Sequence, residues 1–372
     1  MIYFDNAATS KPKPEEVYDA LIYYLKEIGT SPGRGSYGLA IQASRMLYQS
    51  RKTVANFFGA QDPANVVFTK NSTEAINLFF NGFLQDGDHV IISPYEHNAV
   101  LRPLETLKRK GRIDYTVLPE HVVYDPKELK QYVLDNTRLL AVTLASNLTG
   151  QVVFSKELAD NAKQMGLFVF VDSSQGAGKK LVQMQRDSID FLAFTGHKDL
   201  LGVPGAGGFV SAEPIHIPPL IQGGTGIHGE SYVNPEAFPD SYEAGTLNMP
   251  AIWALKTGIE YINQNINSIA AREIELLSYL MEKLQQIPGI TVYNPDKKRV
   301  PTICFNVIGR SSSDVVEHLS KHDICVRGGI HCAILAHETI HTVKTGAVRI
   351  SLNHYNTEKE IDKFIEVIGA LV

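Results

Sequence analysis

The chain of 372 residues has few cysteines and no long apolar run. Its three cysteines, Cys304, Cys325 and Cys332, are too few and odd in number for a disulfide framework, and none has the spacing of zinc ligands. No segment approaches the roughly 18 apolar residues that span a membrane. These absences exclude a disulfide-stabilised scaffold and a structural zinc module, and they predict neither a metal site nor a membrane-spanning segment.

Charge of one sign is not concentrated anywhere. The 35 basic and 40 acidic residues give a net charge of -5 and are spread without long blocks. This pattern argues against nucleic-acid and polybasic membrane surfaces, and it leaves small acidic or zwitterionic substrates open. The first residues lack a basic segment followed by an apolar stretch, so we expect no secretion signal and a cytoplasmic location.

Short runs rich in Val, Ile and Phe alternate with helical patterns in the first part of the chain. The expected strands cover residues 65–69, 89–93, 139–145, 167–172 and 190–195, and the expected helices cover 73–83, 98–110 and 156–166. Such alternation predicts βαβ units and an α/β fold with a mainly parallel sheet. Ligands collect at the carboxyl ends of the strands in such sheets.

The second part of the chain has a different pattern. A Gly/Pro-rich stretch, 204–250, precedes a long helical pattern at 251–286, which we expect to be interrupted near residues 263–268. Strands are then expected at 302–307 and 346–351, and helices at 313–322 and 357–371, the last with a capping box. The pattern predicts a large domain, 17–262, and a small α+β domain formed by 1–16 and 263–372.

Lys198 and Asp172 are the first candidates for chemistry. Lys198 follows an apolar run that ends at Thr195, and Asp172 ends the most hydrophobic run of the chain. A lysine amine, an acid at a buried strand end and nearby hydroxyl or imidazole donors are the groups that bind pyridoxal phosphate (PLP). Gln175 could bond the phenolic oxygen of that cofactor. A solvated lysine and an aspartate that begins a turn are the alternatives.

Phosphate donors are expected at two strand ends. Thr195 and His197 lie within three residues of Lys198, and Ser72 and Thr73 stand at a predicted strand-to-helix junction. Free N–H groups and the helix dipole favour an anion at such a junction. An ordinary helix cap explains Ser72 or Thr73 equally well.

His97 and Arg349 are further candidates. The ring of His97 follows another expected strand and could stack on a planar cofactor, although a lone histidine there is usually a polar loop residue. Arg349 lies within an apolar run. A buried arginine is costly without a partner, so either an internal acid or a bound carboxylate must compensate its charge.

Cys332 is the thiol best suited to act as a nucleophile. It lies in a glycine-rich loop directly after His331 and five residues after Arg327. A free thiol, with a pKa near about 8.5, is mostly protonated at neutral pH, and both neighbours could favour the thiolate. Cys304 and Cys325 lie in strand-like runs and fit small buried hydrophobes better.

A series of short motifs runs along essentially the whole chain: residues 3–8 (YFDNAA), 71–75 (NSTEA), 96–98 (EHN), 146–147 (SN), 171–175 (VDSSQ), 195–198 (TGHK), 242–246 (YEAGT), 327–333 (RGGIHCA) and 348–351 (VRIS). In these motifs the chain resembles the class V aminotransferase-like PLP enzymes of fold type I, in their cysteine desulfurase and selenocysteine lyase branch. Its cysteine motif resembles that of the group II desulfurases.

The resemblance implies a fold and a set of residue roles. The fold is the type I PLP-dependent transferase fold, with a seven-stranded sheet in the large domain. Lys198 would form the Schiff base, Asp172 would pair with the pyridine nitrogen, Gln175 would reach the phenolic oxygen and His97 would stack on the ring. The remaining implied binding residues are Ser72, Thr73, Thr195, His197 and Thr246 for the cofactor, Asn147 for cofactor and substrate, and Arg349 and Arg34 for the substrate.

The implied reaction converts L-cysteine to L-alanine and leaves the sulfur as a Cys332 persulfide. A protein sulfur acceptor is expected, and a homodimer follows if Thr246 reaches across from a second subunit. Selenocysteine lyase, cysteine or cystine C–S lyase and class V aminotransferase activities remain alternatives within the family, although an aminotransferase has no need of Cys332. A non-catalytic PLP-binding regulatory protein is the alternative from a different class.

Overall fold

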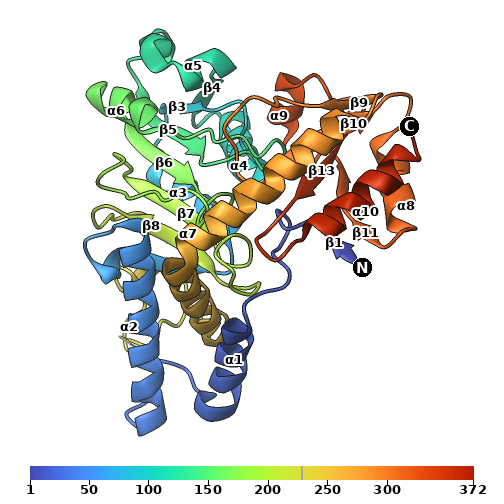
Figure 1. Cartoon of the computed structure of the whole chain (residues 1–372). Helices are drawn as coiled ribbons and strands as arrows, with labels where there is room; N and C mark the ends of the chain where they lie inside the picture. The colour runs from blue at the N-terminus through green and yellow to red at the C-terminus, as the bar shows by residue number, and fades with distance from the viewer. Residues whose placement is uncertain (228) are drawn as a thin grey trace.

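A seven-stranded sheet forms the centre of the protein (Figure 1). The structure, a computed structural model, describes residues 1–227 and 229–372. Within these residues the strand order is β2 (Val66–Thr69), β8 (Gly207–Ser211), β7 (Phe191–Thr195), β6 (Phe168–Asp172), β5 (Thr137–Thr143), β3 (His89–Ile92) and β4 (Asp114–Val117). Strand β8 alone runs in the direction opposite to that of the other strands, so the predicted α/β fold with a mainly parallel sheet is confirmed.

Alternate side chains of the strands enter two different cores, one on each face of the sheet. On one face Phe170 and Phe191 meet the phenylalanines of α3 (Ser72–Phe83), and α4 (Asn98–Arg109) packs beside it. The other face carries α2 (Gly38–Phe58), α5 (Glu120–Tyr124), α6 (Lys156–Gln164) and part of α7 (Met249–Gln285). Burial on both faces explains why these strands are almost continuously apolar.

Strand β8 was missed by the sequence reading, because its glycines resemble a loop. A Cβ atom on Gly208 would collide with the carbonyl oxygen of Val67 in β2, and one on Gly207 would lie 2.7 Å from the Cα of Asn71. These glycines let the backbone of β8 lie close to its neighbours. The composition of the segment from 204 onward therefore reflects close packing as well as turns.

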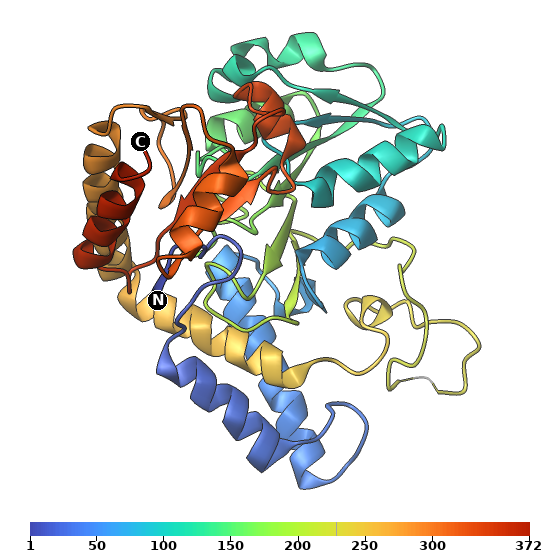
Figure 2. The same ribbon diagram turned by 90° about the vertical axis from the view of Figure 1, so that its right-hand side faces the viewer.

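A smaller antiparallel sheet lies beside the large one (Figure 2). Its order is β12 (Arg327–Gly329), β13 (Ala347–Ser351), β10 (Thr302–Val307) and β9 (Ile290–Val292). Helices α8 (Ser312–Ser320) and α10 (Glu358–Gly369) pack on it, the short α9 (Ile334–Thr339) precedes β13, and β1 (Ile2–Tyr3) pairs with β11 (Ile324–Cys325). The predicted capping box of Thr357 and Glu360 is confirmed at the start of α10.

The predicted interruption of the long helix near residues 263–268 is wrong. Helix α7 runs without a break from Met249 to Gln285 and serves both parts of the molecule. Ile262 and Ile269 are buried seven positions apart, whereas the polar residues between them face outward. Packing of this apolar stripe outweighs the low helix propensity of asparagine. The proposed domain boundary at residue 262 thus falls inside a helix, and the division into two domains stays a prediction.

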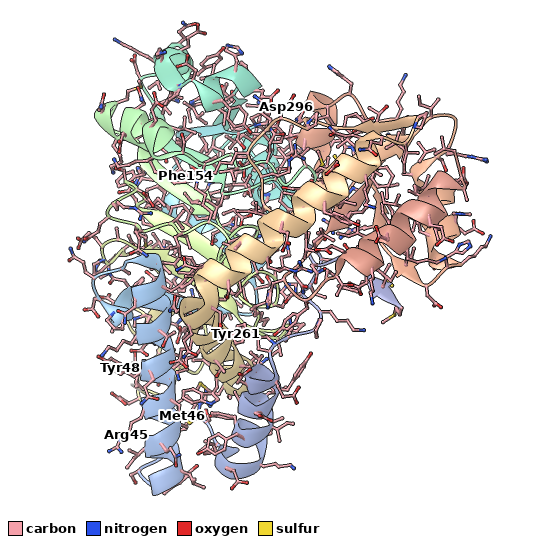
Figure 3. The ribbon with its side chains drawn as sticks, in the orientation of Figure 1. Arg45, Met46, Tyr48, Phe154, Tyr261 and Asp296 are labelled. Carbon is pink, nitrogen blue, oxygen red and sulfur yellow. The ribbon has the colours of Figure 1, made fainter. Side chains whose placement is uncertain are left out.

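Helices α1 (Glu15–Tyr23) and α2 extend below the sheet and pack against α7. Figure 3 shows Met46 on the side of α2 toward α1, and Arg45 and Tyr48 on its outer side. Met46 is buried, whereas Tyr48 is 59% exposed. None of the described helices is long and apolar enough to cross a membrane.

We expect Gly208→Ala to unfold at a clearly lower temperature than the parent protein. The added methyl group must displace the backbone of β2, a kind of strain that costs about 3 kcal/mol. Gly369→Ala is the control, because its Cβ would meet nothing within 4 Å at the end of α10. Thermal unfolding followed by circular dichroism measures both. Equal melting temperatures for the two variants would contradict the close-packing account of β8.

Candidate active site

Lys198 follows β7 in a turn at the carboxyl edge of the large sheet. Burial lowers the pKa of its ammonium, the charge of Asp172 opposes this shift, and Arg349 adds to it. The side chain is only partly accessible, and no hydrogen bond or ion pair holds its amine within the described residues. A lysine in this setting is deprotonated more readily than a free lysine and can attack a carbonyl group.

Asp172 ends β6, the strand beside β7. Its Oδ1 accepts hydrogen bonds from the backbone N of Ser174 at 2.9 Å and from the Ser174 hydroxyl at 2.5 Å. Burial raises the pKa of Asp172, and the bonds from Ser174 work against that rise. In the described part of the chain no donor reaches the other oxygen, Oδ2. A buried carboxylate with one free oxygen is suited to pair with a cationic nitrogen of a ligand.

Several donors near this edge lack partners. The hydroxyl of Thr195 and Nδ1 of His197 are both buried, and neither has a hydrogen-bond partner among the described residues. Burial lowers the pKa of His197 to about 4, so its ring is neutral at pH 7. A buried polar atom without a partner is costly, and a bound phosphate would satisfy both.

The N-terminus of α3 points to the same edge. Asn71 caps this helix, with its Oδ1 accepting from the N of Glu74 at 3.0 Å, so neither Ser72 nor Thr73 is needed as the cap. The Ser72 hydroxyl lies 2.8 Å from that of Ser174 and is thereby linked to Asp172. Thr73 is exposed and stands in the first turn, where backbone N–H groups lack helical partners.

His97 caps the N-terminus of α4. Its Nδ1 accepts a hydrogen bond from the N of Ala99 at 3.0 Å, which leaves the proton on Nε2. Burial lowers the pKa of His97 to about 3, and the positive charges of Lys198 and Arg327 add to the effect. The imidazole is therefore neutral and in one tautomer, with a donor available to a ligand.

Arg349 is buried in β13 and ties distant segments together. Its Nη2 lies 2.5 Å from Oδ1 of Asp5, and its Nη1 donates to the carbonyl oxygen of Asn147 at 2.9 Å. The sequence left an internal acid as one possible partner for Arg349, and that acid is Asp5. Nε of Arg349 and Oδ1 of Asn147 are buried without partners within the described chain, so both can still receive a ligand.

The loop with Cys332 is held against this edge. The N of Asn98 donates to the carbonyl oxygen of Cys332 at 2.8 Å, and Nδ2 of Asn147 donates to that of His331 at 2.7 Å. Both His331 and Cys332 have positive φ, of 55° and 56°. The Cys332 side chain is exposed and lines a hollow of about 380 Å³ together with Thr73, His97 and Arg102. The thiol and the imidazole thus face the same space.

The expectation that His331 supplies positive charge to Cys332 is wrong. The His331 ring is buried, its Nε2 donates to the carbonyl oxygen of Arg327 at 3.1 Å, and the ring stacks on His337 with ring centroids 5.8 Å apart. Burial lowers its pKa to about 3, with Arg349 adding to the shift, so the ring is neutral at pH 7. Arg327 is exposed and remains a cation beside the loop.

The other candidates occupy different places. Gln175 is buried and its Nε2 donates to the carbonyl oxygen of Ala7 at 2.7 Å. Arg34 and Thr246 are both exposed, and Arg34 donates to the carbonyl oxygen of Gly245 at 2.8 Å, next to Thr246. Within the described residues, no hydrogen bond or ion pair joins the side chain of Arg34 or Thr246 to Lys198 or Asp172. Burial raises the pKa of Cys304 to about 12, which leaves that thiol inert.

Sequence reasoning missed Asp5, Asn98 and Glu96. Asp5 and Arg349 are 344 positions apart, so no local spacing indicates their ion pair. Glu96 is fully buried, accepts from the N of Thr143 at 2.7 Å and has its pKa raised to about 8 by burial. This neutral carboxyl fixes the turn that carries His97 to the end of β5. In the sequence, the only indication that Glu96 belongs to the site is its position directly before His97.

Asp5→Asn should lower the free energy of unfolding by about 3 kcal/mol, because it leaves the charge of Arg349 buried without an acid. Asp86→Asn is the matched control, since Asp86 pairs with Arg112 at the surface and should contribute no more than about 1 kcal/mol. Urea unfolding measures both variants at pH 7. A loss for Asp5→Asn no larger than for the control would contradict the structural role of this pair.

The sequence was compared with known proteins. It matches the family model described as aminotransferase class-V over residues 2–364. A protein named probable cysteine desulfurase from Methanothermobacter thermautotrophicus is 34% identical, over 99% of this chain and 94% of that protein. The apo structure of a cysteine desulfurase from Thermococcus onnurineus NA1 has a TM-score of 0.92 and 33% identity, covering 100% of this chain and 94% of that one. The cysteine desulfurase CsdA of Escherichia coli has a TM-score of 0.87 and 27% identity.

Proposed function

This chain belongs to the class V aminotransferase family, in its cysteine desulfurase group, and we propose that it is a PLP-dependent enzyme that converts L-cysteine to L-alanine. The observation that carries the proposal is the exposed Cys332 thiol, which shares a hollow with the neutral imidazole of His97. The amine of Lys198 and the carboxylate of Asp172 stand at the carboxyl edge of the large sheet, and Arg349 of β13 donates to the carbonyl oxygen of Asn147 after β5. Related PLP enzymes that transfer amino groups have no use for such a thiol.

The residues at this edge fit PLP. Thr195 Oγ1 and His197 Nδ1 are buried donors without partners in the described chain, and the first turn of α3 favours an anion, so all three support a phosphate site. Asp172 has a free oxygen for the pyridine nitrogen, and Lys198 has an amine of lowered pKa for the Schiff base. His97 would cover the ring, and Gln175 would reach its phenolic oxygen.

PLP supplies an electron sink that weakens the bonds at the substrate's α-carbon. The chain's own residues do the rest of the work. Nε of Arg349, a buried donor without a partner in the described region, would donate to the substrate carboxylate. The unpartnered atom of Asn147 is the acceptor Oδ1, so Asn147 would accept a hydrogen bond from an N–H or O–H group of the substrate or cofactor. Nε2 of His97 would hold a proton beside the substrate. Burial around Lys198 and Asp172 keeps water away from the reacting carbon.

The Cys332 thiol would take the sulfur. It attacks the substrate sulfur, a sulfur–sulfur bond forms as the carbon–sulfur bond breaks, and the carbon receives a proton, so that L-cysteine and the thiol become L-alanine and a Cys332 persulfide. Its exposure at the mouth of the hollow suits a later transfer to a sulfur-acceptor protein. L-Selenocysteine would fit the same carboxylate and cofactor contacts.

We also propose a homodimer and a cytoplasmic location. Arg34 and Thr246 lie together on the surface, next to exposed apolar side chains that include Tyr37, at 57%, and Leu39, at 45%. An apolar surface of this kind usually meets a partner. A second copy seated there would bring Thr246 to the phosphate and Arg34 to the substrate of its neighbour.

Lys198→Ala should remove the absorbance of bound PLP above 400 nm, since no other lysine in the described part of the chain combines burial with a neighbouring strand-end acid. Borohydride treatment of the unchanged protein should fix the cofactor to the peptide that contains Lys198. Lys70→Ala, at an exposed position on the same edge, should keep the absorbance. Recovery of the label on a peptide with a different lysine would refute the assignment.

Cys332→Ala should still bind L-cysteine, seen as a spectral change of the cofactor, but should lose alanine formation by roughly a hundredfold or more. Mass spectrometry after one turnover should show one added sulfur on the Cys332 peptide of the unchanged protein. Cys325→Ala is the control and should retain turnover. Full alanine production by Cys332→Ala would argue against the thiol mechanism, and pyruvate with ammonia would identify a C–S lyase instead.

A further inference from the structure

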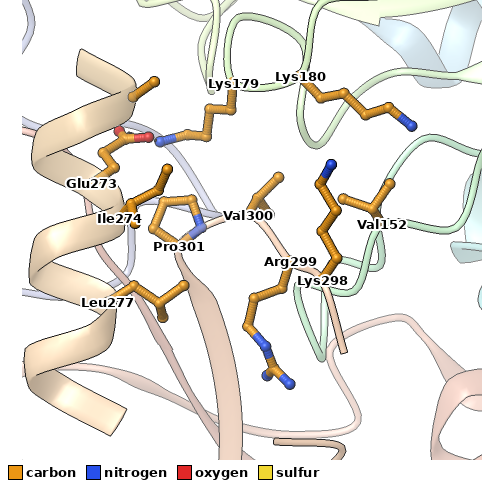
Figure 4. A pocket seen from close by; sticks show the side chains of 11 residues that line it. Val152, Lys179, Lys180, Glu273, Ile274, Leu277, Lys298, Arg299, Val300 and Pro301 are labelled. Carbon is orange, nitrogen blue, oxygen red and sulfur yellow. Dashed lines mark hydrogen bonds and ion pairs between the residues drawn. The ribbon is translucent and has the colours of Figure 1, made fainter. Parts of the chain in front are cut away.

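A cleft of about 190 Å³ lies between α7 and the segment that leads into β10 (Figure 4). Its floor is apolar and consists of Ile274 and Leu277 of α7 with Val300 and Pro301. Lysine side chains stand at its upper rim. The cleft is separate from the hollow that Cys332 lines, because the two share no residue.

The cations of this cleft differ in how they are neutralised. Lys179 forms an ion pair with Glu273 and lies 3.6 Å from Asp199, so its charge is compensated. Lys180 donates only to the carbonyl oxygen of Phe154, at 2.5 Å, and no acid pairs with it in the described chain. The ammonium of Lys298 makes no hydrogen bond or ion pair within the described residues, and in Figure 4 the side chain extends toward Lys180.

The positive charge between these two lysines is unfavourable in the unliganded protein. Burial, together with the nearby charge of Lys298, lowers the pKa of Lys180 to about 8, although the charge of Asp187 opposes this shift. Arg299 adds a third cation, which has no ion pair within the described residues. It points away from the floor and donates to the carbonyl oxygen of Thr149 at 3.2 Å. A bound anion would relieve the repulsion, because opposite charge stabilises a partly buried ammonium.

The wall of the cleft is continuous with the active site. The backbone N of Val152 donates to the carbonyl oxygen of Lys298, and the N of Val300 donates to that of Gly150, each at 2.9 Å. The segment that these bonds hold begins at Asn147, which contacts both Arg349 and the Cys332 loop. A ligand that orders residues 298–300 would therefore change the conformation or mobility of the segment that positions Asn147.

We propose that this cleft binds a small phosphorylated molecule, with its phosphate between the ammonium groups of Lys180 and Lys298 and its carbon chain on Ile274 and Leu277. Lysines act as point charges toward phosphate, and the apolar floor suits a short carbon chain. The cleft volume of about 190 Å³ leaves room for a phosphate with a short carbon chain. This inference goes beyond the proposed reaction and does not rest on it.

Calorimetric titration of the purified protein with its cofactor tests the proposal, using glycerol 3-phosphate, inorganic phosphate and glycerol as probes. Both phosphates should bind and glycerol should not. Tighter binding of glycerol 3-phosphate identifies a phosphorylated molecule as the ligand, and equal binding identifies free phosphate; either result supports a phosphate site. The proposal would be overturned if glycerol bound as strongly as the two phosphates, or if neither phosphate bound.

Two variants locate the binding. Lys298→Gln should weaken phosphate binding by about fivefold or more, because it removes one of the two charges. Lys297→Gln is the matched control, since this neighbour is also exposed but lies over the ring of Tyr124, 4.5 Å from its centroid. It should bind phosphate as the unchanged protein does. The same loss in both variants would show a diffuse charge effect and would refute the site.

Discussion

The ion pair of Arg349 and Asp5 is the interaction on which the candidate site depends. It joins the N-terminal segment to the small sheet, and the same guanidinium binds the carbonyl oxygen of Asn147 after β5. Three segments that are far apart in sequence thus meet at one buried cation. Removing two charged groups from water is costly, so this ion pair adds little net stability to the fold. Its contribution is the geometry that it gives to the site. The unpartnered Nε then remains for a ligand.

Neutral imidazoles complete this arrangement. His97, His197 and His331 all have pKa values lowered by burial, and none carries charge at pH 7. Each therefore acts through a specific ring nitrogen and not through an electrostatic field. The fixed positive charges at the edge are arginines, which keep their protons. The histidines thus supply hydrogen bonds of fixed direction, and the arginines supply the positive charge. A neutral histidine can therefore stand beside the amine of Lys198 without repelling it.

The sequence predicted the sheet and its edge well, because strand-end residues such as Thr195 and Asp172 follow apolar runs directly. It failed where distant packing decides the outcome. Gly207 and Gly208 resembled a loop, and only the neighbouring backbone shows why β8 needs them. The polar residues after Ile262 resembled a helix end, yet buried isoleucines on the other side keep α7 continuous. Adjacency in sequence also placed His331 beside Cys332 without revealing that the ring turns inward.

The same reasoning separates the cations that the fold needs from those that it leaves for ligands. Lys179 lies beside Glu273 and Asp199, and Arg349 lies beside Asp5, so both of these buried cations have an acid within the chain. Lys180 is partly buried and has only a carbonyl oxygen. A carbonyl dipole cannot offset the loss of water around an ammonium as a carboxylate does. Within the described residues Lys180 has no such carboxylate, and the cleft beside it has room for the anion that we propose.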